Sequence, residues 1–133
     1  MVLVILLVLA LFVVQTLLPG RFREPVADGL KTKLIEDLGN RDDMRPLTVT
    51  GQRASRALAN MHEALPVFLA LALLNMIVGT AAGMAVTGAT IFLIARVLYV
   101  AVYTVGIPVV RTLIWVAGWV GLVLMLVPLL DKI

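Results

Sequence analysis

The chain has 133 residues, of which 62% are hydrophobic and 14% are charged, and its formal net charge is +3. A soluble domain of average composition carries about 25% charged residues, so this composition excludes an ordinary soluble fold and indicates an integral membrane protein. The lack of cysteine excludes disulfides, thiolate metal sites and a cysteine nucleophile, and a single histidine leaves little for a metal site. We expect one membrane domain over residues 1–133, surrounded by membrane lipids, without a metal or a nucleic-acid partner.

Four apolar segments are expected to cross the bilayer as helices, each near the roughly 20 residues that a span requires. They are residues 1–18, 57–78, 90–105 and 109–130. The first lacks a positively charged start and a small-residue cleavage site, which favours a permanent span over a signal peptide. Residues 79–89 are predicted to form a turn, and Gly106 and Pro108 are predicted to end the third helix before the last span. The sequence therefore predicts an all-α, four-helix membrane bundle.

The long polar segment, residues 19–52, carries six basic and six acidic side chains. Because basic residues in short loops set the orientation of a membrane protein, we expect this loop to be cytoplasmic and both termini to lie on the opposite side. Within the loop, a short amphipathic helix is predicted from Val26 to Leu38, ended by Gly39. Thr50 is the expected N-cap of the second helix.

Ionisable side chains inside membrane spans are costly, so each one is a candidate functional residue. The second helix carries, at spacings that share one face, Arg53, Arg56, Asn60 and Glu63. The third helix carries Arg96, Tyr99 and Tyr103 by the same spacing, and the fourth begins with Arg111. In the predicted topology these groups lie towards the cytoplasmic ends of their helices. We expect them to form one basic, tyrosine-lined pocket.

Structural roles are also open for these residues. The arginines can be interfacial anchors that reach lipid phosphates, and the tyrosines can belong to an aromatic belt. Glu63 lies one to two turns inside its span and needs a partner, either Arg96 or Arg56 or a ligand. Asn60 can equally join two helices by hydrogen bonding. His62 lies opposite the polar face, which favours a packing or interface role.

The stretch from Arg53 to Phe68, RASRALANMHEALPVF, resembles a known second-helix signature, RAxxNxxExxPxF. That signature is typical of the membrane-associated proteins in eicosanoid and glutathione metabolism, the MAPEG family. The stretches ARVLYVAVY and PVVR, which end at Tyr103 and Arg111, resemble the rest of the family pattern. Chain length, four spans and the long loop after the first span agree as well. The resemblance covers essentially the whole chain and is to a prokaryotic-type member.

The resemblance implies a homotrimer of four-helix subunits, with glutathione as a cosubstrate bound between neighbouring subunits near the cytoplasmic face. The residues that it implies as glutathione contacts are Arg23, Arg56, Asn60, Glu63, Arg96, Tyr99 and Tyr103. Arg111 stands at the position of the family arginine that stabilises the thiolate. A fixed guanidinium beside a thiol favours the anion and so creates a nucleophile at neutral pH. The implied activity is a transferase or peroxidase acting on hydrophobic electrophiles or lipid hydroperoxides.

Two other functions are open. The first is a non-enzymatic trimeric membrane protein that holds a lipid or other anion in the same basic cleft. The second is a small proton-coupled transporter that uses Glu63, which is disfavoured because this carboxylate lies among arginines and because a long charged loop is foreign to a minimal transporter. The segment between Tyr103 and Arg111 lacks the basic residues of eicosanoid-producing relatives, so the ligand site is expected to be less basic than theirs.

Overall fold

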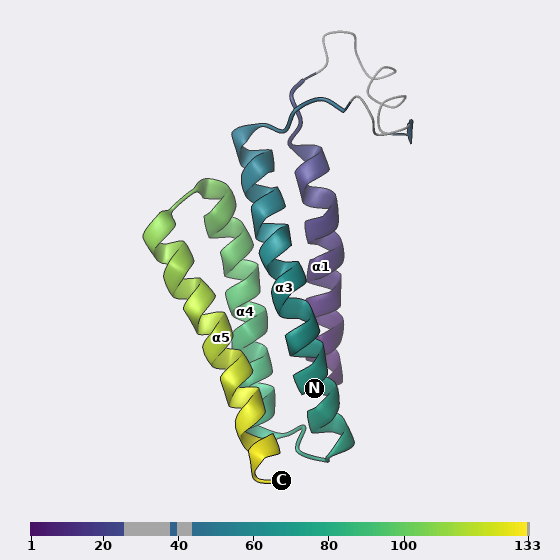
Figure 1. The fold of residues 1–133 in the computed structure, drawn as a ribbon, viewed down its shortest axis with the longest axis vertical. Helices are drawn as coiled ribbons and strands as arrows, with labels where there is room; N and C mark the ends of the chain where they lie inside the picture. The colour runs from purple at the N-terminus through teal and green to yellow at the C-terminus, as the bar shows by residue number, and fades with distance from the viewer. Residues whose placement is uncertain (26–37, 40–43, 133) are drawn as a thin grey trace.

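The structure is a computed structural model that describes residues 1–25, 38–39 and 44–132. The elements are α1 (Val2–Arg21), α3 (Val49–Ile77), α4 (Gly83–Val105) and α5 (Pro108–Leu130), which run side by side (Figure 1). Each of these helices is long and apolar enough to cross a membrane. The predicted all-α, four-helix membrane bundle is therefore confirmed. The short helix predicted from Val26 falls almost entirely outside the described residues.

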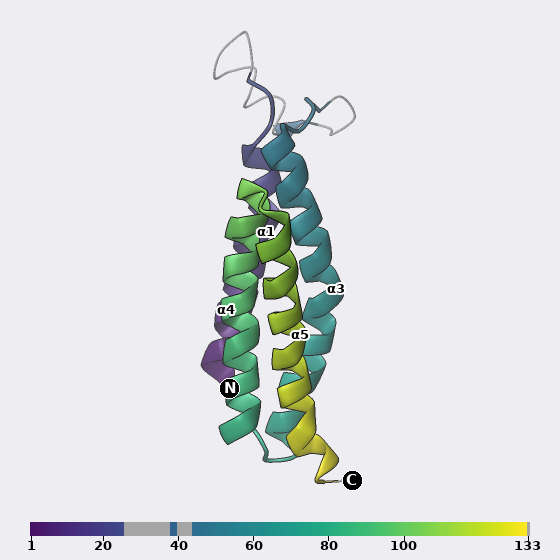
Figure 2. The same ribbon diagram turned by 90° about the vertical axis from the view of Figure 1, so that its left-hand side faces the viewer.

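The helices alternate in direction, so the start of α1 and the end of α5 lie at one end of the bundle, and the end of α1 and the start of α3 lie at the other (Figure 1). We call the latter the loop end. α3 packs against α1, α4 and α5, and α5 packs most closely along α4. The second view shows α4 and α5 as a hairpin on one side of the bundle (Figure 2). The side of the membrane on which the loop end lies stays a prediction.

Two details of the predicted helices are wrong. Gly83–Val105 is continuous helix, so most of the expected turn over residues 79–89 is helical, and the true turn has Gly79 at φ +78°. Ala85, Gly88 and Ala89 of this segment are buried in the α4 interface instead, where packing outweighs the weak helix propensity of the glycine. The N-cap of α3 is Thr48 rather than Thr50, because the Thr48 hydroxyl accepts a hydrogen bond from the Gly51 amide at 3.2 Å.

The base of the long loop is closed by a short backbone pairing. Thr48 donates through both its amide and its hydroxyl to the carbonyl of Phe22, at 3.0 and 2.9 Å. Arg23 and Leu47 form an isolated antiparallel bridge beside this contact. A Cβ at Gly51 would collide with the Phe22 carbonyl, so glycine is required for this approach. The end of α1 and the start of α3 are thus fixed relative to each other.

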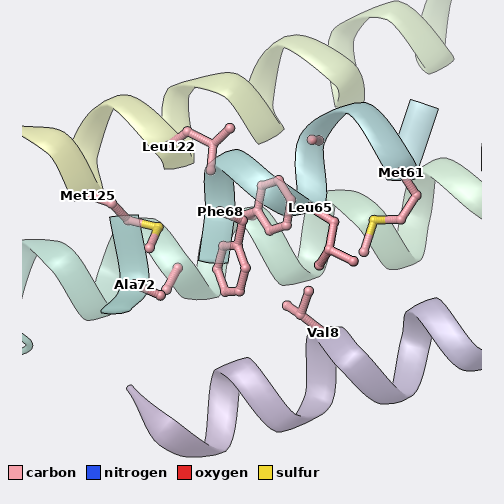
Figure 3. Close-up of a cluster of buried hydrophobic side chains, with 10 residues drawn as sticks. Val8, Met61, Leu65, Phe68, Ala72, Leu122 and Met125 are labelled. Carbon is pink, nitrogen blue, oxygen red and sulfur yellow. The ribbon is translucent and has the colours of Figure 1, made fainter. Parts of the chain in front are cut away.

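The core lies between the helices and is built from side chains of all of them. Val8, Leu65, Phe68 and Met125 are among the residues that meet there (Figure 3), and the rings of Phe68 and Phe92 stack at 4.7 Å between centroids. Lipid is as apolar as these side chains, so close packing rather than water exclusion holds such helices together in a bilayer. The many exposed valine and leucine side chains on the outer faces fit the same environment.

The closest helix approach is between α4 and α5, where two glycines face each other. A Cβ at Gly121 would lie 2.6 Å from the carbonyl oxygen of Gly88 and 2.9 Å from the amide nitrogen of Phe92. A Cβ at Gly88 would collide in turn with the Gly121 carbonyl oxygen. Small residues at such positions allow backbones in a membrane to approach closely. This contact fixes the position of α4 relative to α5, and these two helices carry most of the candidate site residues.

Candidate functional site

Polar side chains from α3, α4 and α5 line two pockets towards the loop end of the bundle. The first, which we call the aromatic pocket, has a volume of about 250 Å³ and is lined by Tyr99, Tyr103, Arg111, Thr112 and Trp115. The second, the arginine pocket, has a volume of about 160 Å³ and is lined by Arg53, Arg56, Tyr103, Gly106, Ile107, Pro108 and Arg111. The two pockets share Tyr103 and Arg111. The structure thus brings together Arg56, Tyr99, Tyr103 and Arg111 of the predicted site.

Arg111 stands where the two pockets meet. It lies in the first turn of α5, and its guanidinium carbon is 4.9 Å from the ring centroid of Tyr103. Tyr103 in turn contacts Tyr99, with 5.3 Å between ring centroids. A cation over an aromatic face gains about 0.5–2 kcal/mol, which fixes the guanidinium while leaving its N–H groups free for another partner. Within the described part of the chain, no carboxylate or carbonyl accepts a hydrogen bond from Arg111.

The arginine pocket is strongly cationic. Arg53, Arg56 and Arg111 contribute three guanidinium groups, and none of the described residues that line it is acidic. The start of α5, with Pro108 in its first turn, adds the positive end of a helix dipole. Grouped cations attract anions, and guanidinium groups pair with carboxylates through two parallel hydrogen bonds. The chemistry of this pocket suits a carboxylate-bearing ligand.

Arg96 and Asn60 form a buried link between α4 and α3 and line neither pocket. Arg96 is 2% exposed, and its Nη1 donates to the Asn60 side-chain oxygen at 2.6 Å. The guanidinium lies 4.9 Å from the ring centroid of Phe92 and 5.8 Å from that of Tyr99, and Gly118 on α5 lies beside it. The Nε and Nη2 atoms of Arg96 are buried without a hydrogen-bond partner. The structure therefore shows Asn60 in one of the roles left open for it, a hydrogen bond between two helices.

Two other predicted site residues, Glu63 and Arg23, line neither pocket. Glu63 is exposed on the surface of α3 and forms no ion pair among the described residues, so the salt bridge to Arg96 or Arg56, one of its two open roles, is not observed there. Arg23 sits at the base of the loop, where it donates to the Arg45 carbonyl and lies 3.3 Å from the Met44 sulfur.

His62 contacts the Leu58 carbonyl at 3.0 Å and the ring of Phe12 at 5.1 Å between centroids, which agrees with its predicted packing role. None of these residues lines either pocket.

Sequence reasoning missed two residues of the aromatic pocket, Thr112 and Trp115. Trp115 lies four residues after Arg111, on the same face of α5, and its ring contacts Trp119 at 5.8 Å between centroids. Neither residue is costly to place in a membrane, so neither was marked as a candidate. The i, i+4 spacing from Arg111 was the available signal.

The fold and the pockets define a four-helix membrane protein with a cationic, tyrosine-lined site at the loop end of the bundle. The model of the MAPEG family matches residues 1–130 of this chain. The chain therefore belongs to the MAPEG family, which includes glutathione transferases and peroxidases. Comparisons with curated proteins and with solved structures gave no match.

Proposed function

We propose that this protein is a membrane-bound, glutathione-dependent transferase or peroxidase that acts on hydrophobic electrophiles or lipid hydroperoxides. The observation that carries the proposal is the position of Arg111. Its guanidinium is shared by a cationic pocket and an aromatic pocket, and it is held against Tyr103 without a hydrogen-bonding partner among the described residues. Family membership supports glutathione as the ligand.

Glutathione fits the chemistry of the two pockets. It carries two carboxylates, an ammonium group and a thiol, and Arg56 together with the rest of the arginine pocket offers guanidinium donors for the carboxylates. Arg111 at the boundary would stabilise the thiolate, because a nearby cation lowers the pKa of a thiol. The rings of Tyr99, Tyr103 and Trp115 offer an apolar surface for a hydrophobic second substrate that arrives from the bilayer.

The bound thiolate would then act as the nucleophile. In the transferase reaction, sulfur attacks the electrophilic carbon of the second substrate, a carbon–sulfur bond forms, and the leaving group departs with the bonding electrons. In the peroxidase reaction, the thiolate attacks the terminal oxygen of a hydroperoxide and the oxygen–oxygen bond breaks. The alkoxide takes up a proton to become an alcohol, and the glutathione sulfenic acid condenses with a second glutathione to give a disulfide and water.

We propose that the working unit is a homotrimer with ligand sites between subunits and with loop 19–52 on the cytoplasmic side. Glu63 supports such an assembly, because an exposed carboxylate within a membrane helix is costly unless a partner meets it. A neighbouring subunit, or the ammonium group of glutathione held between subunits, would supply that partner. Arg23, Asn60 and Arg96 are retained as proposed contacts only in that assembled state, since they line neither pocket of the single subunit.

The proposal is tested by glutathione binding to the detergent-purified protein. Ultraviolet difference absorbance reports the thiolate, and we expect a signal at neutral pH that Arg111→Ala abolishes. Arg21→Ala is the matched control, because Arg21 is an exposed arginine at the end of α1 and lines neither pocket. Trp119→Phe leaves Trp115 as the sole tryptophan, so its fluorescence reports ligand binding whether or not a thiolate forms. Thiol-dependent turnover that survives Arg111→Ala unchanged for every accepted substrate contradicts the proposal.

The second candidate is a non-enzymatic membrane protein that binds a lipid or other anion in the same cleft. The cationic lining of the arginine pocket, in which no described residue is acidic, favours an anion without requiring chemistry. Absence of a thiolate signal at millimolar glutathione, together with an anionic lipid retained in native mass spectra, would support this candidate over the enzyme.

A further inference from the structure

The last carbonyl groups of α4 receive hydrogen bonds from another helix. The amides of Gly106 and Ile107 both donate to the Val102 carbonyl, at 2.9 and 3.4 Å. The chain then turns away through Gly106, at φ +92°, and Pro108 has no N–H to donate. The carbonyls at the end of a helix lack donors within that helix and need them from elsewhere.

Arg53 of α3 supplies the missing donors. Its Nη1 donates to the Val105 carbonyl at 3.0 Å and to the Thr104 carbonyl at 3.4 Å. A guanidinium also suits this place electrostatically, because the C-terminal end of a helix carries a partial negative charge. In a membrane, where water is scarce, carbonyls that lack protein donors are costly. Arg53 is therefore the cap of α4, although it belongs to α3.

Gly106 has no side chain, which leaves room for the Arg53 guanidinium. A Cβ at this position would lie 2.5 Å from the guanidinium carbon of Arg53 and 2.8 Å from its Nη2. A side chain would thus displace Arg53, in addition to opposing the positive φ. The α4–α5 turn and Arg53 consequently form one unit, which ties the start of α3 to the hairpin.

This unit determines where Arg111 stands. α5 begins at Pro108, and the Arg111 amide donates to the Ile107 carbonyl at 3.2 Å, so the first turn of α5 follows directly from the Gly106 turn. Asn75 provides a polar link between α3 and α5 at the opposite end of the bundle, by donating to the Met125 carbonyl at 2.8 Å. At the loop end, Arg53 holds the hairpin against α3 by hydrogen bonds to α4.

We propose that Arg53 is a positioning residue for Arg111: it caps α4 and holds the α4–α5 turn, so that the Arg111 guanidinium faces the thiol of the bound ligand. Arg53 itself does not contact that thiol. The catalytic part of this inference rests on the proposed function, whereas the capping part does not.

The first measurement is amide hydrogen exchange of the α4–α5 turn, residues 103–111, in detergent or nanodiscs. We expect Arg53→Met to speed exchange there on the order of tenfold, because the turn loses the hydrogen bonds of its cap. Arg53→Lys keeps a cation and donors, and it should retain part of the protection. Arg56→Met is the matched control, since Arg56 lines the same pocket but makes no hydrogen bond to α4. Unchanged exchange in Arg53→Met overturns the proposal.

The second measurement is the pH profile of the glutathione thiolate signal. In Arg53→Met we expect the thiol pKa to rise towards that of free glutathione, with Arg53→Lys in between, while binding reported by Trp115 fluorescence changes less. A general loss of stability would not move this profile in the protein that stays folded. A wild-type protein without any thiolate signal removes the proposed function and the positioning role, whereas the exchange data still show whether Arg53 holds the turn.

A bypass experiment separates positioning from direct ligand contact. The chain has no cysteine, so Arg53→Cys and Val105→Cys introduce a single pair of thiols, and Val105 is exposed for labelling. Joining them with bismaleimidoethane replaces the hydrogen bonds by thioether links that glutathione does not cleave. We expect the cross-link to restore both slow exchange and the thiolate pH profile. Restored exchange without a restored profile shows that the Arg53 charge acts on the ligand itself, and overturns the proposal.

Discussion

Arg96 illustrates what a single buried cation requires inside a membrane bundle. It is almost fully buried, the faces of two aromatic rings surround it, and Asn60 accepts a hydrogen bond from its Nη1. Its other two guanidinium nitrogen atoms have no hydrogen-bond partner among the described residues. Removing the one acceptor leaves the charge less satisfied, whereas removing both groups leaves only apolar side chains. The two residues should therefore be energetically coupled.

We expect Asn60→Leu to lower the free energy of unfolding by about 1.5–3 kcal/mol, the range for a hydrogen bond to a charged group. Combining it with Arg96→Met should cost clearly less than the sum of the single changes, because the unpaired cation is then gone. Unfolding in mixed detergent micelles measures each variant of the cycle. Additive losses would mean that Asn60 does not serve Arg96.

At the scale of elements, the α4–α5 hairpin contains a helix–helix contact that could not be recognised from the sequence alone. Gly88 and Gly121 look like weak points of helices, yet each leaves space for the backbone of the other. Alanine usually favours a helix over glycine by about 1 kcal/mol. Here the added Cβ meets main-chain atoms, which move only if the two helices separate.

Gly88→Ala and Gly121→Ala should each destabilise the protein by about 1–3 kcal/mol, the usual cost of overpacking a tight contact, despite the gain in helix propensity. Gly20→Ala in α1 is the matched control, because nothing lies within 4 Å of the Cβ that it adds. Thermal unfolding followed by the helical circular dichroism signal in detergent compares them. Equal melting temperatures for all three variants would exclude a close contact of α4 and α5 at these glycines.

The number of helices was predictable because long apolar segments in a membrane have few alternatives to helix. The shared faces of the site residues followed from helical periodicity. The start of α4 at Gly83 was not predictable, since small residues that suggest a turn are also those that pack against a neighbouring helix. The capping of α4 by Arg53 was not predictable either, because it depends on where α4 ends and which helix passes beside it. Contacts between elements distant in sequence have no local signal.

At the scale of the whole molecule, the exposed surface of the helices carries two kinds of side chain, aliphatic and ionisable. Large aliphatic side chains are exposed along all the helices, as expected for contact with lipid. Glu63 is the one acidic residue of these four helices, and it is exposed on α3, a helix long enough to span the membrane. Arg111, by contrast, faces the pockets of its own subunit. If a complete ligand site needs both residues, two neighbouring subunits would each supply one of them.

Mixing two inactive variants tests this arrangement. We expect Arg111→Ala and Glu63→Gln to impair glutathione-dependent turnover individually, since one lacks the thiolate-stabilising cation and the other the proposed partner of the ammonium group. In trimers assembled from equal amounts of both, about a quarter of the head-to-tail interfaces would pair an intact Arg111 with an intact Glu63, so turnover should partly return. Assembly of each variant alone, checked by a detergent-corrected mass of three chains, is the control. Mixed oligomers without any recovery would place both residues in sites formed by one subunit.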